Sequence, residues 1–126
     1  MPQIKVLVVD DSVLSREMLI SILSLDEEIQ IVGQASNGRD AVDKVSRFKP
    51  NIVTMDIEMP VMNGLDFLRT LRSDDDHVVA DLPVVIVSAA EGTVAEQARG
   101  MANGFLRKPV AMESFLTMVT RFCGPA

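Results

Sequence analysis

The sequence has few cysteines, few aromatic residues and no excess of basic charge, and each shortage excludes a class of protein. Its 126 residues include one cysteine, Cys123, and neither tryptophan nor tyrosine. A single cysteine excludes an internal disulfide framework and fits a reducing compartment. The 18 acidic residues outnumber the 12 lysines and arginines, which gives a formal net charge of −6. Because a nucleic-acid surface needs the opposite sign of charge, we expect no direct nucleic-acid binding.

Long apolar runs and targeting segments are also missing. No stretch approaches the roughly 18 consecutive apolar residues that a membrane span requires. The opening MPQIKVLVVDD has too short an apolar run for a signal peptide, and acids follow it at once. We therefore expect a cytoplasmic protein without a membrane partner. The length and the 48% content of hydrophobic residues fit one domain of ordinary size, and we expect residues 1–126 to form it.

Apolar runs rich in valine and isoleucine alternate with helical patterns along the chain. Several of these runs are continuously apolar, which is typical of strands buried on both faces. Between them, apolar residues recur at spacings of three and four, as on one face of a helix. Strands are predicted at residues 4–9, 29–35, 51–55, 83–88 and 104–107. The helical stripes are Leu14, Met18, Leu19, Ile22 and Leu23; Ala41, Val42, Val45 and Phe48; Leu65, Leu68 and Leu71; and Met112, Phe115, Leu116, Val119 and Phe122.

Helix boundaries and the remaining segments complete the pattern. Ser12 is a suitable N-cap for the first helix, and Pro50 marks the end of the second. A weaker helix with glycines at both ends is predicted within residues 91–102. We interpret residues 73–81 as a polar loop that holds His77 in solvent. Five successive βα units with short, right-handed connections predict an α/β fold, an open parallel sheet with helices on both faces.

Polar side chains stand at the carboxyl ends of four predicted strands. Asp10 and Asp11 follow the first strand, Asp56 follows the third, Ser88 ends the fourth and Lys108 follows the fifth. In an open α/β sheet these ends form one crevice, which is where ligands bind. We therefore expect three carboxylates, a hydroxyl and an ammonium group to converge there.

Three clustered carboxylates need a cation. Two unit charges about 5 Å apart repel by roughly 3 kcal/mol at an effective dielectric near 20. Mg²⁺ prefers oxygen ligands and commonly combines carboxylates with phosphate oxygens. Lys108 and Ser88 would then contact phosphoryl oxygens, and Asp56 would be the nucleophile that forms an aspartyl phosphate. The turn residues Pro60 and Asn63-Gly64 lead the chain away and leave the Asp56 carboxylate open to the crevice.

Each of these features alone is common, because an acidic pair after a strand more often caps a helix and lies in solvent. Their joint placement at four strand ends carries the interpretation. Rival motifs are missing as well. No glycine-rich phosphate loop follows the first strand, and no cluster of cysteine and histidine supports zinc.

Four segments of the chain resemble one protein family. VLVVDDS, VTMDIEMPVMNG, VVIVSA and GFLRKP are similar, in this order, to the motifs of the receiver domain of bacterial two-component response regulators. The resemblance covers essentially the whole chain. The chain most resembles chemotaxis-type receivers, both the stand-alone kind and the receiver that heads the chemotaxis methylesterase, and MDIEMPVMNGLDFL is most similar to the latter. The resemblance implies a flavodoxin-like fold, with a five-stranded parallel sheet of order 2-1-3-4-5.

The resemblance also implies a phosphoacceptor and a metal site. Asp56 would accept a phosphoryl group from a sensor histidine kinase or a phosphotransfer protein. Asp10 and Asp11 would hold Mg²⁺, together with Asp56 and the backbone carbonyl of Glu58.

Further roles implied by the resemblance concern switching. Ser88 would follow the phosphoryl group inward, Phe105 would be the aromatic switch residue, and Lys108 would contact the phosphoryl group from a position before a cis bond to Pro109. Three positions depart mildly from the family pattern: Asn63 stands where aspartate is common, Ser88 replaces a more frequent threonine, and Phe105 replaces a frequent tyrosine. Phe105 lacks a hydroxyl, so a switch-state hydrogen bond from its ring is impossible.

The sequence thus predicts a signalling switch that controls a downstream partner or an output domain. We expect it to catalyse only its own phosphorylation and dephosphorylation, and not to be an enzyme acting on an external substrate. One alternative is a Mg²⁺-dependent phosphatase with an aspartyl-phosphate intermediate, although such enzymes place two acids as D-x-D, whereas Asp10 and Asp11 are adjacent. Another is a binding-only receiver, which would have lost an acid or the lysine. Whether the chain stands alone or belongs to a longer regulator is left open.

Overall fold

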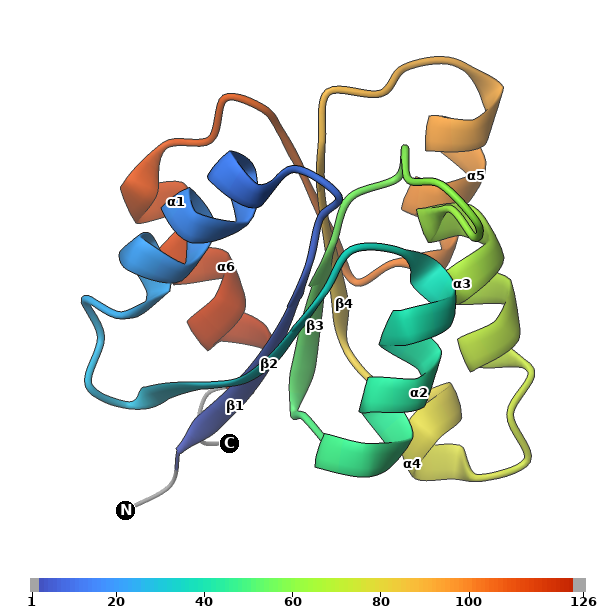
Figure 1. The fold of residues 1–126 in the computed structure, drawn as a ribbon, viewed down its shortest axis with the longest axis horizontal. Helices are drawn as coiled ribbons and strands as arrows, with labels where there is room; N and C mark the ends of the chain where they lie inside the picture. The colour runs from blue at the N-terminus through green and yellow to red at the C-terminus, as the bar shows by residue number, and fades with distance from the viewer. Residues whose placement is uncertain (1–2, 124–126) are drawn as a thin grey trace.

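One parallel sheet of five strands forms the centre of the computed structural model, which describes residues 3–123 (Figure 1). The strands lie in the order β2-β1-β3-β4-β5, as the sequence predicted. The elements are β1 (Ile4–Val9), α1 (Val13–Leu23), β2 (Ile29–Ala35), α2 (Gly38–Phe48), β3 (Ile52–Met55), α3 (Gly64–Arg72), α4 (His77–Ala80), β4 (Val84–Ser88), α5 (Thr93–Met101), β5 (Gly104–Arg107) and α6 (Met112–Cys123).

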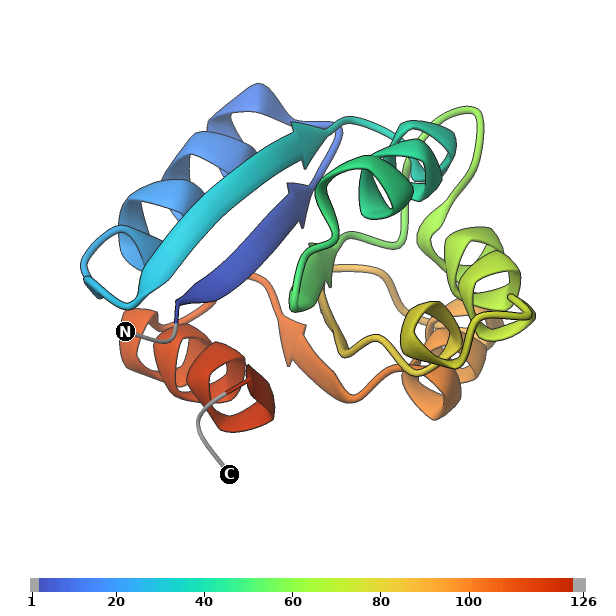
Figure 2. The same ribbon diagram turned by 90° about the horizontal axis from the view of Figure 1, so that it is seen from below.

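Side chains alternate between the two faces of the sheet and create two apolar cores. Helices α1 and α6 cover one face, whereas α2, α3 and α5 cover the other, so the fold has three layers (Figures 1 and 2). Every residue of β3 and β4 is buried, which explains why these strands read as continuously apolar runs. The edge strands β2 and β5 are only partly buried.

The predicted helix ends agree with the structure at two places. Ser12 is the N-cap of α1, and its hydroxyl accepts a hydrogen bond from the backbone N–H of Ser15. Helix α2 ends at Phe48, and Lys49 adopts the left-handed conformation before Pro50. The strands predicted to begin at residues 51 and 83 each begin one residue later. No helix within the described part of the chain is long and apolar enough to cross a membrane.

The segment interpreted as a polar loop contains a short helix, so that prediction was wrong for residues 77–80. Helix α4 begins after Asp76, whose carboxylate accepts a hydrogen bond from the backbone N–H of Val78. Asp76 therefore supplies an N-cap, which the acidic run concealed in the sequence. His77 is exposed on this helix, as expected of a solvated side chain.

The helical stripes are buried less completely than their periodicity predicted. Leu19 and Leu23 of α1 lie in the core, but Leu14 and Met18 are 71% and 57% exposed. Met112, at the start of α6, is 51% exposed. Periodicity places these residues on the apolar stripe, but it does not tell how far the neighbouring elements cover each end of that stripe.

Candidate functional site

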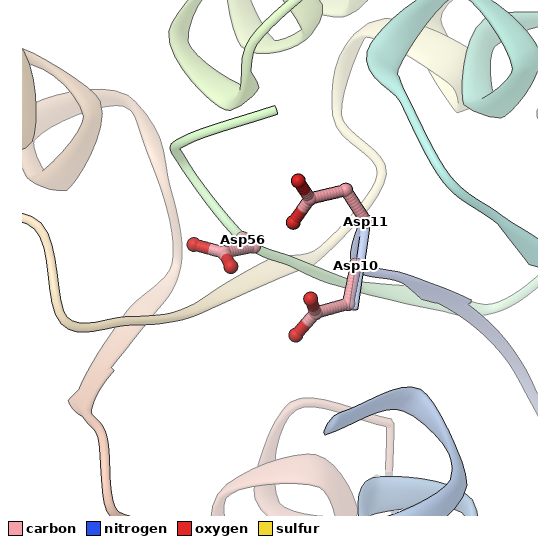
Figure 3. Close-up of side chains that lie close together, drawn as sticks. All are labelled: Asp10, Asp11 and Asp56. Carbon is pink, nitrogen blue, oxygen red and sulfur yellow. The ribbon is translucent and has the colours of Figure 1, made fainter. Parts of the chain in front are cut away.

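Three carboxylates gather where β1 and β3 end. Asp10 and Asp11 follow β1, and Asp56 follows the neighbouring β3. Each offers an oxygen atom, and these atoms all lie within 4.8 Å of one another (Figure 3). Because adjacent parallel strands end at the same edge of a sheet, the order of the strands places these side chains together.

Asp10 is fixed by three hydrogen bonds and is only 1% exposed. One carboxylate oxygen accepts from the backbone N–H of Ser12 at 2.9 Å. The other accepts from the hydroxyl of Ser15 at 2.6 Å and from the Lys108 ammonium at 2.7 Å. The side chain therefore has one well-defined direction, toward the other two acids.

Asp56 lies directly after β3 and is 9% exposed; the cleft denotes the space around Asp10, Asp11, Asp56 and Lys108. Its Oδ1 accepts from the backbone N–H of Ile57 at 2.7 Å, and its Oδ2 accepts from Lys108 at 3.1 Å. The chain then returns so closely that a Cβ atom on Gly64 would lie 2.5 Å from the Asp56 carbonyl oxygen. A glycine is required there, and the tight return keeps the strand end and its carboxylate in place.

Lys108 joins the two buried acids, because its ammonium donates to both Asp10 and Asp56. Burial by itself lowers the pKa of a lysine, but the hydrogen bonds and negative charges of the two carboxylates outweigh it and raise the pKa of Lys108 above its ordinary value. The ammonium is therefore charged at neutral pH. The peptide bond between Lys108 and Pro109 is cis, which confirms that expectation.

Ser15 and Arg16 are site residues that the sequence analysis missed. The Ser15 hydroxyl binds the Asp10 carboxylate, and the Arg16 guanidinium binds the Asp10 carbonyl oxygen at 2.6 Å. Both lie in the first turns of α1, where Ser12 had been considered only as a helix cap. Both residues lie within two helical turns of Asp10 and Asp11, and this closeness in the sequence could have indicated their role. A helix that starts beside a strand end directs the side chains of its first turns back toward that end.

The remaining candidates lie around the cleft and do not all meet the acids. Ser88 is fully buried at the end of β4, and its hydroxyl accepts from the backbone N–H of Ala90 at 3.1 Å. Within the described residues Ser88 makes no hydrogen bond to the three carboxylates. Phe105 on β5 is half-buried, and the Arg99 guanidinium lies 4.3 Å from the centre of its ring. Glu58 is exposed two residues beyond Asp56. The roles predicted for these residues stay predictions.

A tight turn at Pro60 carries the chain away from Asp56, as predicted, whereas the predicted turn pair Asn63-Gly64 forms the N-cap and the first residue of α3. The Met62 N–H donates to the Pro60 carbonyl at 2.7 Å, and Val61 between them has φ 68°. A β-branched residue with positive φ is strained, and such strain concentrates at functional loops. The Met62 carbonyl in turn accepts from the N–H of Gly38 at 2.7 Å, which ties this loop to the start of α2.

The donor set suits a hard divalent cation. The three converging groups are all carboxylates, and neither nitrogen nor sulfur ligands accompany them in the cluster. Oxygen-only sites of this kind are typical of Mg²⁺ and Ca²⁺ and not of zinc. The cleft holds three negative groups against one ammonium, so it retains negative charge for a cation to offset.

Comparisons with known proteins agree with this geometry. The family model described as the response regulator receiver domain matches residues 6–120. The chain is 43% identical over 114 residues to the protein-glutamate methylesterase/protein-glutamine glutaminase of Geobacillus kaustophilus, a match that covers 86% of this chain and 31% of that protein. The protein of the same name from Nocardioides sp. is 42% identical over 118 residues, with 90% of this chain and 31% of that protein covered. The chain thus spans less than a third of the length of these relatives.

Two solved structures are also similar to this chain over most of its length. The response regulator domain of Thermotoga maritima CheB has a TM-score of 0.83 and 31% identity, and the match covers 98% of each chain. The CheX-CheY-BeF3-Mg²⁺ complex from Borrelia burgdorferi has a TM-score of 0.81 and 30% identity, with 93% of this chain and 87% of that chain covered.

The relatives contradict one expectation drawn from the sequence. We expected a switch that is not an enzyme acting on an external substrate, whereas the relatives bear the names of enzymes. The matching part makes up about 30% of those proteins. Receiver residues describe the switch alone, and they carry no information on the chemistry of the part that it controls.

Proposed function

This chain belongs to the receiver domains of two-component response regulators, and from that membership we propose that its acid cleft is the phosphoacceptor site of a single receiver domain spanning residues 1–126. Asp56 accepts a phosphoryl group from a sensor histidine kinase or a phosphotransfer protein. One observation carries this assignment: of the two acids that contact Lys108, Asp56 keeps more of its surface exposed, 9% against 1% for Asp10. Both oxygens of Asp10 already accept hydrogen bonds from α1 or its cap, whereas Oδ2 of Asp56 accepts from Lys108 alone among the described residues.

The chemistry follows from the way the chain holds Asp56. The N–H of Ile57 binds Oδ1 and fixes the carboxylate plane, so the free lone pairs of the carboxylate face the cleft. Attack of a carboxylate oxygen on the phosphorus atom of a phosphohistidine breaks the bond to the donor nitrogen and forms an acyl phosphate on Asp56. Lys108 stays beside the reacting group and offsets the charge of the phosphoryl oxygens.

Asp10, Asp11, Asp56 and the backbone carbonyl of Glu58 are the residues we assign to Mg²⁺. When bound, the ion supplies positive charge that neutralises the carboxylates and the incoming phosphoryl oxygens. The oxygen-only donor set supports this choice of metal. The Mg²⁺ and BeF3 in the Borrelia burgdorferi complex support it further, since that receiver shares the fold.

Switching would proceed through groups that lie next to the cleft. A phosphoryl group on Asp56 brings new acceptor oxygens and negative charge. Lys108 and the hydroxyl of Ser88 gain contacts to it that the unmodified state lacks, which is the condition for a shift in population. Phe105, on the strand before Lys108, passes the change to α5. The switch controls an output of the protein-glutamate methylesterase/glutaminase kind, as its relatives suggest, and acts in the cytoplasm.

The test is phosphorylation of Asp56→Asn by acetyl phosphate with Mg²⁺, followed by intact-mass measurement. The substitution keeps the shape of the side chain and removes the nucleophile, so we expect no stable phosphoryl adduct. Asp43→Asn, an exposed carboxylate on α2, is the matched control and should be phosphorylated like wild type. Equal phosphate uptake by the Asp56 variant would move the nucleophile elsewhere and end the proposal.

A further inference from the structure

The three carboxylates of the cleft are held in different ways. Asp10 and Asp56 are buried, and both accept hydrogen bonds from backbone and side-chain donors. Asp11 is exposed, and its carboxylate accepts no hydrogen bond from any residue that the structure describes. No hydrogen bond or ion pair within the described residues restrains the Asp11 side chain, so the main chain that carries its Cβ atom is the part through which the fold can position it. The peptide unit between Asp10 and Asp11 joins the two neighbouring acids of the cluster, whose side chains are drawn in Figure 3.

Arg16 holds this peptide unit. Its Nη1 donates to the carbonyl oxygen of Asp10 at 2.6 Å, and its Nε donates to the side-chain oxygen of Gln34 at 3.1 Å. Because a peptide unit is planar, a bond to its carbonyl oxygen restricts the ψ angle of Asp10 and the φ angle of Asp11 together. The guanidinium thus restrains the two dihedral angles that aim the Asp11 carboxylate.

Gln34, which Arg16 contacts, is itself held by further contacts. Gln34, at the end of β2, accepts at its backbone carbonyl from the Lys44 ammonium. Lys44 forms an ion pair with Asp40 on α2 at 3.0 Å. The planar guanidinium is therefore anchored at two points, at the residue that follows β1 and on β2, which a single-point cation could not achieve.

We infer that Arg16 is a positioning residue for the metal site and acts through Asp11. The inference rests on the proposed function, because it assumes that the acids bind Mg²⁺. Arg16 itself contacts a carbonyl oxygen and an amide oxygen, and none of the three carboxylates. Its contribution is to hold Asp11 in the direction that completes the cluster.

A charge effect and a positioning effect predict opposite changes in Mg²⁺ affinity when Arg16 is replaced. Removal of a positive charge near three carboxylates makes the site more negative, so charge alone would tighten Mg²⁺ binding. Loss of the restraint on the Asp10–Asp11 peptide frees Asp11 and weakens Mg²⁺ binding. A measured weakening therefore identifies the positioning role and separates it from a simple charge effect.

The experiment is a titration with Mg²⁺ alone, followed by amide NMR shifts or calorimetry, on the wild type and three variants. We expect Arg16→Met to bind Mg²⁺ on the order of tenfold more weakly, the lower end of the loss when a group supporting a metal ligand is removed. Arg16→Lys keeps one donor and should recover part of the affinity. Arg39→Met, which removes an exposed charge from the first turn of α2, should bind as tightly as wild type or slightly more tightly.

A double-mutant cycle with Asp11→Ala tests the route of the effect. If Arg16 acts through Asp11, then Arg16→Met causes no further loss once Asp11 is gone. Equal losses in both backgrounds would overturn the inference, as would unchanged or tighter binding by Arg16→Met. If Arg16→Met does not fold, Gln34→Leu removes one anchor of the guanidinium, and binding two- to threefold weaker than wild type is expected, on the order of half a logarithmic unit. Failure of the wild type to bind Mg²⁺ would instead remove the proposed metal site.

Discussion

Two cations, one at the carboxyl ends and one at the amino ends of the strands, stabilise the molecule in different ways. Lys108 lies at the carboxyl edge and donates to two carboxylates, Asp10 and Asp56. Arg72, at the end of α3, lies at the amino ends of β4 and β5, and within residues 3–123 it donates to neutral oxygens alone. Its partners are the carbonyls of Ala80, Leu82 and Met101 and the side-chain oxygen of Asn103.

The environments of these two cations shift their pKa values in opposite directions. Burial lowers the pKa of Arg72, and the negative charge of Asp81 offsets this only in part. The carboxylates beside Lys108 outweigh its burial and raise its pKa. An arginine that donates to several carbonyls fastens chain segments, and among the described residues Arg72 donates no hydrogen bond to a charged group. A lysine between two acids is paired with groups that can take another cation. One end of the strands is therefore fastened by neutral acceptors, whereas the other holds the charged groups of the proposed site.

The largest effect is expected from Arg72→Met. The substitution leaves acceptors at the ends of α4 and α5 and ahead of β4 without their donor, and we expect a loss of about 3 kcal/mol in the free energy of unfolding. Urea unfolding measures it. Arg69→Met removes a more exposed charge from the same helix and should cost less than about 0.5 kcal/mol. If the two variants are equally stable, Arg72 does not fasten this edge.

A smaller loss, with a different response to metal, is expected from Lys108→Met. Without Mg²⁺ the acids Asp10 and Asp56 lose their counter-charge, and we expect the free energy of unfolding to fall by about 1–2 kcal/mol. Excess Mg²⁺ should shrink the difference from wild type, because the ion replaces the lost charge. The Arg72→Met difference should stay constant over the same titration. If the difference in unfolding free energy between wild type and Lys108→Met does not change with Mg²⁺, the contrast drawn between Lys108 and Arg72 is wrong.

A gain of stability is expected from Thr54→Val. Four polar side chains are buried within the described residues, namely Asp10, Thr54, Asp56 and Ser88, and all lie in the half of the sheet nearer the cleft or at its floor. The hydroxyl of Thr54 is the one without a hydrogen-bond partner among the described residues. Replacing it with a methyl group should stabilise the fold by about 1 kcal/mol in thermal or urea unfolding. Val85→Thr, directly beside it on β4, should change stability in the opposite direction.

The smallest and most specific effect concerns pH. The pKa of Lys108 is raised in the folded state, so its contribution to stability is complete below the ordinary lysine value of 10.5. That contribution should decline only as the pH rises through the raised folded value. The difference in unfolding free energy between wild type and Lys108→Met should therefore be flat from neutral pH to about 10 and fall above it. If this difference in unfolding free energy has already disappeared before the rising pH reaches 9, the ion pairs of Lys108 do not carry the stabilisation.

Much of this molecule can be predicted from its sequence, for physical reasons. The apolar runs around Val53 and Val85 are strands because they are buried on both faces, and the residues after them mark the cleft. The partner of each group is harder to predict. Nothing in the order of residues tells that Lys108 bridges two acids in the resting state, or that Ser88 turns its hydroxyl to the N–H of Ala90. Such choices depend on rotamers and on loop geometry, which periodicity does not encode.

The residues that hold the acids in place are hard to predict from the sequence for the same reason. Arg16 on a helix reads as a solvated charge, and its bond to the Asp10 carbonyl becomes visible only when α1 is placed against β2. The acidic run before Val78 concealed a helix cap, because a capping aspartate and a loop aspartate look alike in sequence. Tertiary contact, and not local preference, decides such positions.

The ammonium that bridges Asp10 and Asp56 also has a consequence for ion selectivity. Lys108 is a tethered cation, so its effective concentration at the cleft is far above that of a free ion of the same charge. A sodium or potassium ion that entered would bring one positive charge to a place where one is already supplied, and it would have to shed water to do so. A divalent ion brings an additional charge and gains from the exposed Asp11 as well. If the acids bind Mg²⁺ as proposed, the resting salt bridge would therefore favour divalent over monovalent ions, even where monovalent ions are abundant.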